Sequence, residues 1–171
     1  MAARISAGIL LYRIADGAAQ VFLVHPGGPF WSRKDDGAWT IPKGEAESTL
    51  DSEGDLLATA RREFAEETGV RVDGDFVPLQ PIRQKSGKRV HAWALAGDID
   101  ASAIVSNTFT LEWPPRSGAL RTYPEVDRGA WFTLDEARRK LLPAQCAFID
   151  QLQAMLDPRA GADVRDVHSP L

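Results

Sequence analysis

The sequence has little cysteine, no long hydrophobic run and no excess of positive charge. Its one cysteine, Cys146, cannot form a disulfide within the chain or a metal site built from several thiolates. The apolar run over residues 7–12 lies between Arg4 and Arg13 and is too short for a membrane span or a signal segment. We therefore expect an intracellular, cytoplasmic protein with no membrane partner.

The charge balance argues against a general nucleic-acid binder. The chain has 20 Lys and Arg against 24 Asp and Glu, a formal net charge of −4, whereas such binders carry a basic surface. The glycine-rich loops of P-loop and dinucleotide-binding folds are also absent. With 171 residues, 44% of them hydrophobic, the chain suffices for one domain but is small for two. We expect a single domain over residues 1–156 and a polar C-terminal tail over residues 157–171.

Apolar runs separated by turn residues predict a mixture of strands and helices. Strands are expected over residues 5–12, 21–24 and 126–132, and a hairpin over 76–83 and 89–95. Helices are expected over residues 55–68, 133–141 and 144–156. A long loop covers residues 26–42 and ends in a short extended piece, and residues around 113–115 look irregular. This order predicts an α/β sandwich with a central mixed β-sheet.

The helix predicted over residues 55–68 carries the most informative side chains. Glu63, Glu66 and Glu67 stand at positions i, i+3 and i+4 and share one helical face. Carboxylates that crowd one face repel each other, and a divalent cation with oxygen ligands would neutralise them. The alternative is a solvated acidic face on which Arg62 pairs with Glu66.

The sequence around this helix resembles the signature of the Nudix hydrolases. That signature is a glycine, five residues, a glutamate, seven residues, Arg-Glu, an apolar residue, any residue, Glu-Glu, any residue, a glycine and an apolar residue. Gly44 matches the first glycine, and residues 62–70 match the whole second half. Arg62 follows Gly44 by eighteen positions instead of fourteen, so four residues are inserted. We place the insertion within residues 45–51, with Glu53 in place of the first glutamate.

The resemblance implies a Nudix-like α/β/α sandwich and a metal-dependent pyrophosphohydrolase. In such an enzyme Mg²⁺, or Mn²⁺ as a substitute, would be bound by the Glu63, Glu66 and Glu67 carboxylates and by the Gly44 carbonyl oxygen. The metal would neutralise charge on a diphosphate and activate water. The substrate implied is a nucleoside diphosphate linked to another group.

Other residues are expected to assist this reaction. Lys43 is placed to contact a phosphate, because it stands beside the matching glycine. Glu66 is a candidate general base, and Glu125, on the approach to the last predicted strand, is a second candidate. Trp31 and Trp39 flank the loop before the signature, and we expect Trp39 to form one wall of a base pocket.

The substrate and the activity leave alternatives open. The run from Pro42 to Gly44 is similar to that of dinucleoside polyphosphate hydrolases, which favours such a substrate over ADP-ribose or a free triphosphate. The insertion favours instead a nucleotide-binding regulatory module that has the same fold without turnover. Isomerisation of a prenyl diphosphate is a third hypothesis, but that branch relies on a reactive cysteine and Cys146 falls in a late predicted helix. A homodimer is compatible with the sequence.

Overall fold

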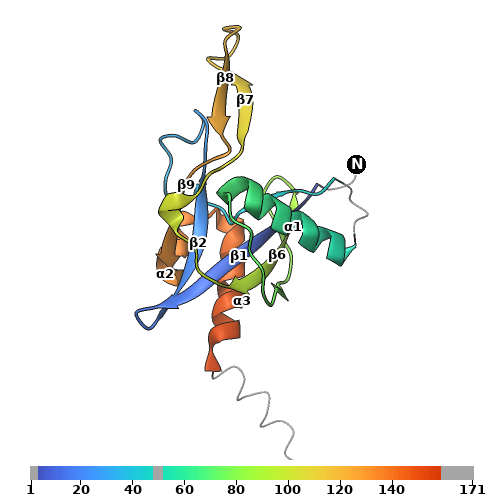
Figure 1. Ribbon diagram of the computed structural model, residues 1–171, viewed down its shortest axis with the longest axis vertical. Helices are drawn as coiled ribbons and strands as arrows, with labels where there is room; N and C mark the ends of the chain where they lie inside the picture. The colour runs from blue at the N-terminus through green and yellow to red at the C-terminus, as the bar shows by residue number, and fades with distance from the viewer. Residues whose placement is uncertain (1–3, 48–51, 159–171) are drawn as a thin grey trace, which may run out of the picture.

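The computed structural model describes residues 4–47 and 52–158 (Figure 1). The strands are β1 (Ile5–Ala15), β2 (Ala18–Pro26), β3 (Lys43–Glu45), β4 (Val77–Pro78), β5 (Ile82–Arg83), β6 (Arg89–Ala96), β7 (Thr108–Glu112), β8 (Leu120–Pro124) and β9 (Val126–Thr133). The helices are α1 (Glu53–Thr68), α2 (Leu134–Lys140) and α3 (Cys146–Leu156), with 3₁₀ turns η1 (Ala101–Ala103) and η2 (Pro143–Gln145).

A mixed sheet forms the centre of the domain, as the sequence predicts. Its main order is β4-β6-β1-β2-β9, with β3 paired to β1 and β5 paired to β6. β1 and β6 run parallel, whereas the other pairs in this sheet are antiparallel. The two predicted N-terminal strands are confirmed and are longer than expected. They meet through Asp16 and Gly17, which both have positive φ, 53° and 77°, as a two-residue hairpin turn requires.

Helices cover both faces of the sheet, so the fold is an α/β sandwich (Figure 1). Alternate side chains of β1 point to opposite faces. Ile9 packs in a core with Phe64 of α1, whereas Leu10 packs in a second core with Phe148 of α3. All four side chains are fully buried. β1 is therefore apolar along its middle because it has a hydrophobic layer on each side.

Helix α1 begins and ends at residues with the expected capping chemistry. The Ser52 hydroxyl accepts a hydrogen bond from the Asp55 amide, and the Asp55 side chain accepts one from the Ser52 amide. These reciprocal bonds form a capping box that starts the helix at Glu53, two residues before the predicted start at Asp55. At the other end Gly69 has φ 76° and its amide donates to Ala65, which is the left-handed stop that a glycine favours.

Two strands that the sequence analysis did not predict lie on either side of residues 113–115, which we expected to be irregular. Strands β7 and β8 form a separate two-stranded sheet, and Figure 1 shows this hairpin extending away from the rest of the domain. Phe109 and Leu111 are partly buried, whereas Thr108, Thr110 and Glu112 between them are exposed. This alternation is the strand signal in the sequence, and the prolines at positions 114 and 115 obscured it.

The remaining elements agree with prediction in outline. In the expected hairpin over 76–83 and 89–95, the second arm forms β6, but the first is reduced to β4 and β5, with Pro81 between them, because proline has no amide for the ladder. In the short extended piece, Trp39 and Thr40 make isolated bridges to Leu141 and Val24 before β3 begins. Thr133 caps α2 as expected, and the last predicted helix forms as η2 followed by α3.

Two predictions fall on parts of the chain that the structure does not describe. Most of the polar tail expected over residues 157–171 lies outside the described residues, as do residues 48–51 of the expected insertion and the side chain of Glu53. Within the described ranges, no helix is both long and apolar enough to cross a membrane.

Candidate active site

Gly44 lies directly against the carboxylate of Glu63. Strand β3 pairs with the start of β1, where Ala7 is opposite Gly44. A Cβ added at position 44 would be 2.0 Å from Cδ of Glu63, far inside van der Waals contact. Only a glycine therefore lets the strand and the helix approach this closely. The first glycine of the sequence signature therefore contacts the second half of the signature, although four extra residues separate the two along the chain.

Glu67 lies one helical turn further along α1 and is almost completely buried. It is 9% exposed, and the Lys43 amide donates a hydrogen bond of 3.3 Å to its Oε2. Burial raises the pKa of Glu67 to about 8, the positive charge of Lys43 opposes this rise, and the negative charges of Glu63 and Glu125 add to it. Without a cation, Glu67 thus holds a proton at neutral pH.

Burial and nearby charges also shift the pKa values of Glu63 and Lys43. Burial raises the pKa of Glu63, the negative charge of Glu66 raises it further, and a hydrogen bond from Arg62 lowers it. Burial also lowers the pKa of Lys43, as does the positive charge of Lys88, against the opposing carboxylates of the cluster. The ammonium of Lys43 lies in the field of Glu67, Glu45 and Glu63, whose charges raise its pKa. A bound phosphate would add an acceptor for it.

Glu66 faces solvent beside Arg62. The Arg62 guanidinium lies 3.8 Å from the Glu66 carboxylate, 3.3 Å from Glu63 and 3.6 Å from Glu47. The i,i+4 pair expected for a solvated acidic face is therefore present. It does not describe the whole face, because Glu63 and Glu67 are withdrawn from solvent.

Glu125 approaches the cluster from the opposite side, between β8 and β9. Its amide donates to the carbonyl of Asn107 at 2.9 Å, and its carbonyl accepts from the amide of Gly27 at 2.8 Å. The charge of Glu125 contributes to the raised pKa of both Glu63 and Glu67, so the loop brings it near them. Gly27 and Asn107 hold this loop, and nothing in the sequence predicted their role. A Cβ at Gly27 would lie 1.9 Å from the Pro124 carbonyl oxygen.

The residues brought together fit a divalent cation. Carboxylate and carbonyl oxygens are the ligands that Mg²⁺ prefers. Burial first, and repulsion between carboxylates second, raise the pKa values of Glu63 and Glu67, and a cation would favour their ionised forms. Within the described residues, no three His, Cys, Asp or Glu side chains already form a complete metal-binding group. The Lys43 amide contacts Oε2 of Glu67 and Arg62 contacts Oε1 of Glu66, so each carboxylate has a second oxygen that these contacts do not use.

The structure does not bring Trp39 to this cluster. Trp39 is 3% exposed and packs in the core under α2 and α3, on the other face of the sheet from α1. Its indole donates to the Asp35 carboxylate at 2.8 Å, and its ring contacts Phe132 edge-on. An indole buried in this way offers no free face to a base. We therefore do not retain the expectation that Trp39 forms a base pocket wall.

Comparison with solved structures gives the same fold. The NUDIX domain of NrtR from Shewanella oneidensis, in complex with ADP ribose, has a TM-score of 0.61 and 19% identity, covering 92% of this chain and 90% of that chain. A binary complex of the Ap4A hydrolase of C. elegans has a TM-score of 0.58 and 19% identity, covering 90% and 97%. S. oneidensis NrtR in complex with a 27mer DNA has a TM-score of 0.52 and 18% identity, covering 89% of this chain and 61% of that chain.

Sequence comparison identifies the family. No curated protein sequence matches the chain. The family model described as NUDIX domain matches residues 3–152, which include the whole sheet, the contact between Gly44 and Glu63 and the loop that carries Glu125. The chain therefore belongs to the NUDIX domain family.

Proposed function

We propose that this chain is a metal-dependent pyrophosphohydrolase that cleaves the diphosphate linkage of a nucleoside diphosphate joined to another group. The observation that carries the proposal is the contact of Gly44 with Glu63, together with the hydrogen bond from the Lys43 amide to Glu67. These contacts place the carboxylates of α1 beside Lys43 and Gly44 of β3, where a phosphate could bind. Members of the family generally use divalent metal ions, and Mg²⁺ suits these ligands best.

Each residue has a distinct task in this proposal. Glu63, Glu66, Glu67 and the Gly44 carbonyl would hold Mg²⁺, with Mn²⁺ as a substitute, and the bound ion would supply charge neutralisation and a more acidic water. Glu67 must lose its proton to become a ligand. The Lys43 ammonium would bind a phosphate oxygen and stabilise the charge that develops there.

A general base must take the proton of the attacking water. Glu66 is exposed on the helix, and Glu125 faces the cluster from a loop fixed by backbone hydrogen bonds. Glu125 suits this role better, because it is not needed by Arg62 and its backbone is anchored on both sides. The leaving group would depart with a phosphate, giving two phosphorylated products.

Dinucleoside polyphosphates are the substrate class that we favour. The Pro42-Lys43-Gly44 run supports this choice, as does the similarity in fold to an Ap4A hydrolase. The test is product analysis on diadenosine polyphosphates, ADP-ribose, nucleotide sugars and triphosphates, each with Mg²⁺ and with a chelator. Metal-dependent cleavage of the first class would support the full proposal. Cleavage of another class alone would correct the substrate, and no cleavage would contradict the reaction.

A nucleotide-binding module without turnover is the second candidate. The NUDIX domain of NrtR, crystallised with ADP ribose, has the same fold. The DNA-bound NrtR chain extends beyond the region that this chain covers, so a DNA-binding role is not part of this candidate. Tight nucleotide binding with no product under Mg²⁺ or Mn²⁺ would favour it, and light scattering with and without the nucleotide would test whether a homodimer forms.

A further inference from the structure

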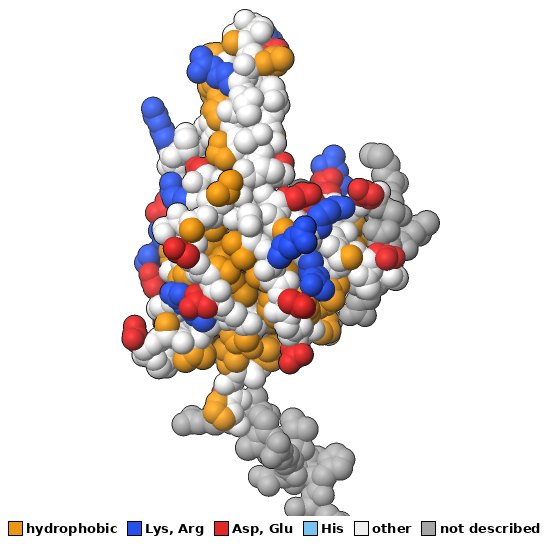
Figure 2. Space-filling model, viewed as in Figure 1, with side chains coloured by type: hydrophobic (Ala, Val, Ile, Leu, Met, Phe, Trp, Pro, Cys, Tyr) orange, Lys and Arg blue, Asp and Glu red, His pale blue; other side chains and the backbone are white. Residues whose placement is uncertain are grey.

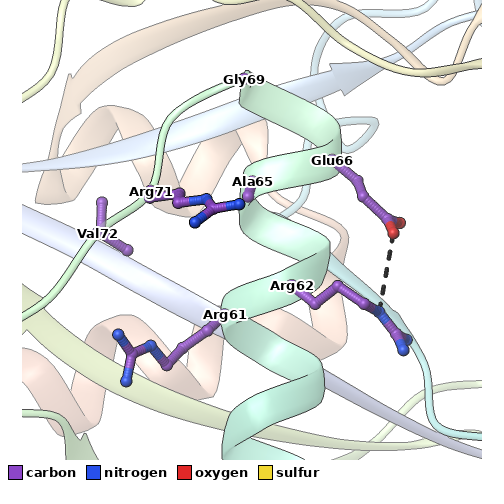
Figure 3. A pocket seen from close by; sticks show the side chains of 7 residues that line it. All are labelled: Arg61, Arg62, Ala65, Glu66, Gly69, Arg71 and Val72. Carbon is purple, nitrogen blue, oxygen red and sulfur yellow. Dashed lines mark ion pairs between the residues drawn. The ribbon is translucent and has the colours of Figure 1, made fainter.

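A groove lined by three arginines runs along the flank of α1 (Figure 3). Its volume is about 550 Å³. Arg61 and Ala65 lie in it, and by helical periodicity they are on the side of α1 opposite Glu63 and Glu67. Glu66 also lines the groove. The groove is thus separate from the buried carboxylates, and the exposed residues Arg62 and Glu66 lie between the two.

The third arginine enters the groove because the chain reverses after α1. Gly69 ends the helix in the left-handed conformation, and the chain then runs back along the helix, carrying Arg71 with it. Figure 3 shows the Arg71 guanidinium lying beside Ala65. The small side chain of Ala65 and the absence of one at Gly69 keep this part of the groove open.

Positive charge in the groove is only partly balanced. Arg61 forms an ion pair with Asp73 at 3.5 Å and lies 5.1 Å from the centre of the Phe76 ring. Arg62 pairs with Glu66 at the edge of the groove and also with Glu63 and Glu47. Arg71 forms no ion pair with any residue in the described ranges. Figure 2 shows Lys and Arg side chains gathered on this part of the surface, with Asp and Glu side chains around them. Arg71 is therefore the guanidinium of the groove that has no carboxylate partner among the described residues and can accept an anion.

We propose that this groove binds a phosphate group. Guanidinium groups bind phosphate through paired hydrogen bonds, and here Arg61 is already positioned by Phe76 and Asp73. The volume exceeds that of one phosphate and accommodates a short phosphate chain. The phosphate comes either from the far end of a substrate held at the carboxylates or from a separate phosphorylated molecule. Either source uses the same contacts, and the proposal does not depend on the reaction proposed above.

The test is calorimetric titration of the full chain with inorganic tripolyphosphate in the presence of a chelator. The chelator removes any metal-bridged binding at the carboxylate cluster, and the comparison of the groove variants with a control variant assigns the remaining binding to the groove. We expect saturable binding that Arg71→Gln weakens by about 10-fold or more, because charged hydrogen bonds are lost. Arg121→Gln on β8 is the matched control, since it removes the same charge from an exposed strand, and it should leave the affinity unchanged. Arg61→Gln provides a second groove variant, and melting curves verify that all the variants fold.

Two results would overturn the proposal. One is equal affinity in the groove variants and in Arg121→Gln, and the other is equally strong binding of sulfate at the same ionic strength, which would show a general attraction of anions. A second titration, with Mg²⁺ and a non-hydrolysable nucleotide, distinguishes the two sources of phosphate. Competition with tripolyphosphate identifies the substrate's own phosphate chain, and simultaneous binding identifies a separate ligand.

Discussion

The amide of Asn107 donates a hydrogen bond of 2.8 Å to the carbonyl oxygen of Glu66. The Asn107 carbonyl in turn accepts a hydrogen bond from the amide of Glu125. One residue therefore joins the last turns of α1 to the loop that approaches the carboxylates from the other side. Both bonds are made by the backbone, so they fix the two segments relative to each other regardless of the side chain at position 107.

Removing the charge of Glu67 tests the proposed metal ligands. We expect Glu67→Gln to fold normally and to lower turnover by about 100-fold or more, because the amide binds a divalent cation poorly. Raising the Mg²⁺ concentration should recover part of the loss. The measurement is turnover against metal concentration on the best substrate of the panel. Unchanged activity would remove Glu67 from the ligand set.

The same variant tests the burial of Glu67 without any reaction. Its pKa of about 8 in the folded chain lies above the value of 4.5 for an ordinary glutamate. Between these values unfolding releases a proton, so the stability of the metal-free protein falls as the pH rises. A single independent group contributes at most about 1.4 kcal/mol per pH unit. Glu67→Gln cannot titrate and should therefore be the more stable protein at pH 8.5, with the difference shrinking toward pH 5.

Melting temperatures in a chelator, measured from pH 5 to pH 8.5, give this comparison. Glu66→Gln is the matched control, since it removes an exposed carboxylate from the same helix. Saturating Mg²⁺ should oppose the loss of stability at high pH in the unmodified chain, because a cation favours the ionised carboxylate. A difference between Glu67→Gln and the unmodified chain that does not vary with pH would contradict the raised pKa.

A methyl group at Gly44 tests the contact with Glu63. The added Cβ in Gly44→Ala would overlap the carboxylate, so either β3 or Glu63 must move. A displacement of about 1 Å near a reacting centre can cost about 100-fold in rate, and we expect a loss of that order. Gly54→Ala is the control, because it lies in the first turn of α1, where the added Cβ would lie 3.9 Å from the Ser52 hydroxyl, an ordinary van der Waals contact. It should keep full activity, and its stability should be equal or higher.

The sequence predicted the site best where its geometry depends on local structure. The face shared by Glu63, Glu66 and Glu67 follows from helical spacing alone, and the helix was predictable from Ala60, Phe64 and the stop at Gly69. The proximity of Gly44 followed from the resemblance to the family, because no local rule brings it to α1. The bond that joins Asn107 to Glu66 could not be predicted, since the backbone of any residue except proline can make it.

Trp39 and the β7–β8 hairpin show why the rest was not predictable. The side of the sheet to which Trp39 points is set by the bridge of its neighbour Thr40 to Val24 and by its own bridge to Leu141, which are contacts between distant segments. A tryptophan beside a glycine-rich loop can equally be a ligand wall or core. The hairpin likewise depends on pairing between Phe109 and Tyr123, which are separated by a turn containing two prolines.

Glu125→Gln separates a general base from a metal ligand. If Glu125 accepts the proton of the attacking water, the variant should lose about 100- to 10,000-fold in kcat with little change in KM or in metal affinity. Glu66→Gln, measured in parallel, should instead raise the Mg²⁺ concentration needed for activity. If the two variants show the opposite pattern, Glu66 is the base and Glu125 a ligand, because the two carboxylates face the same cluster from α1 and from the loop before β9.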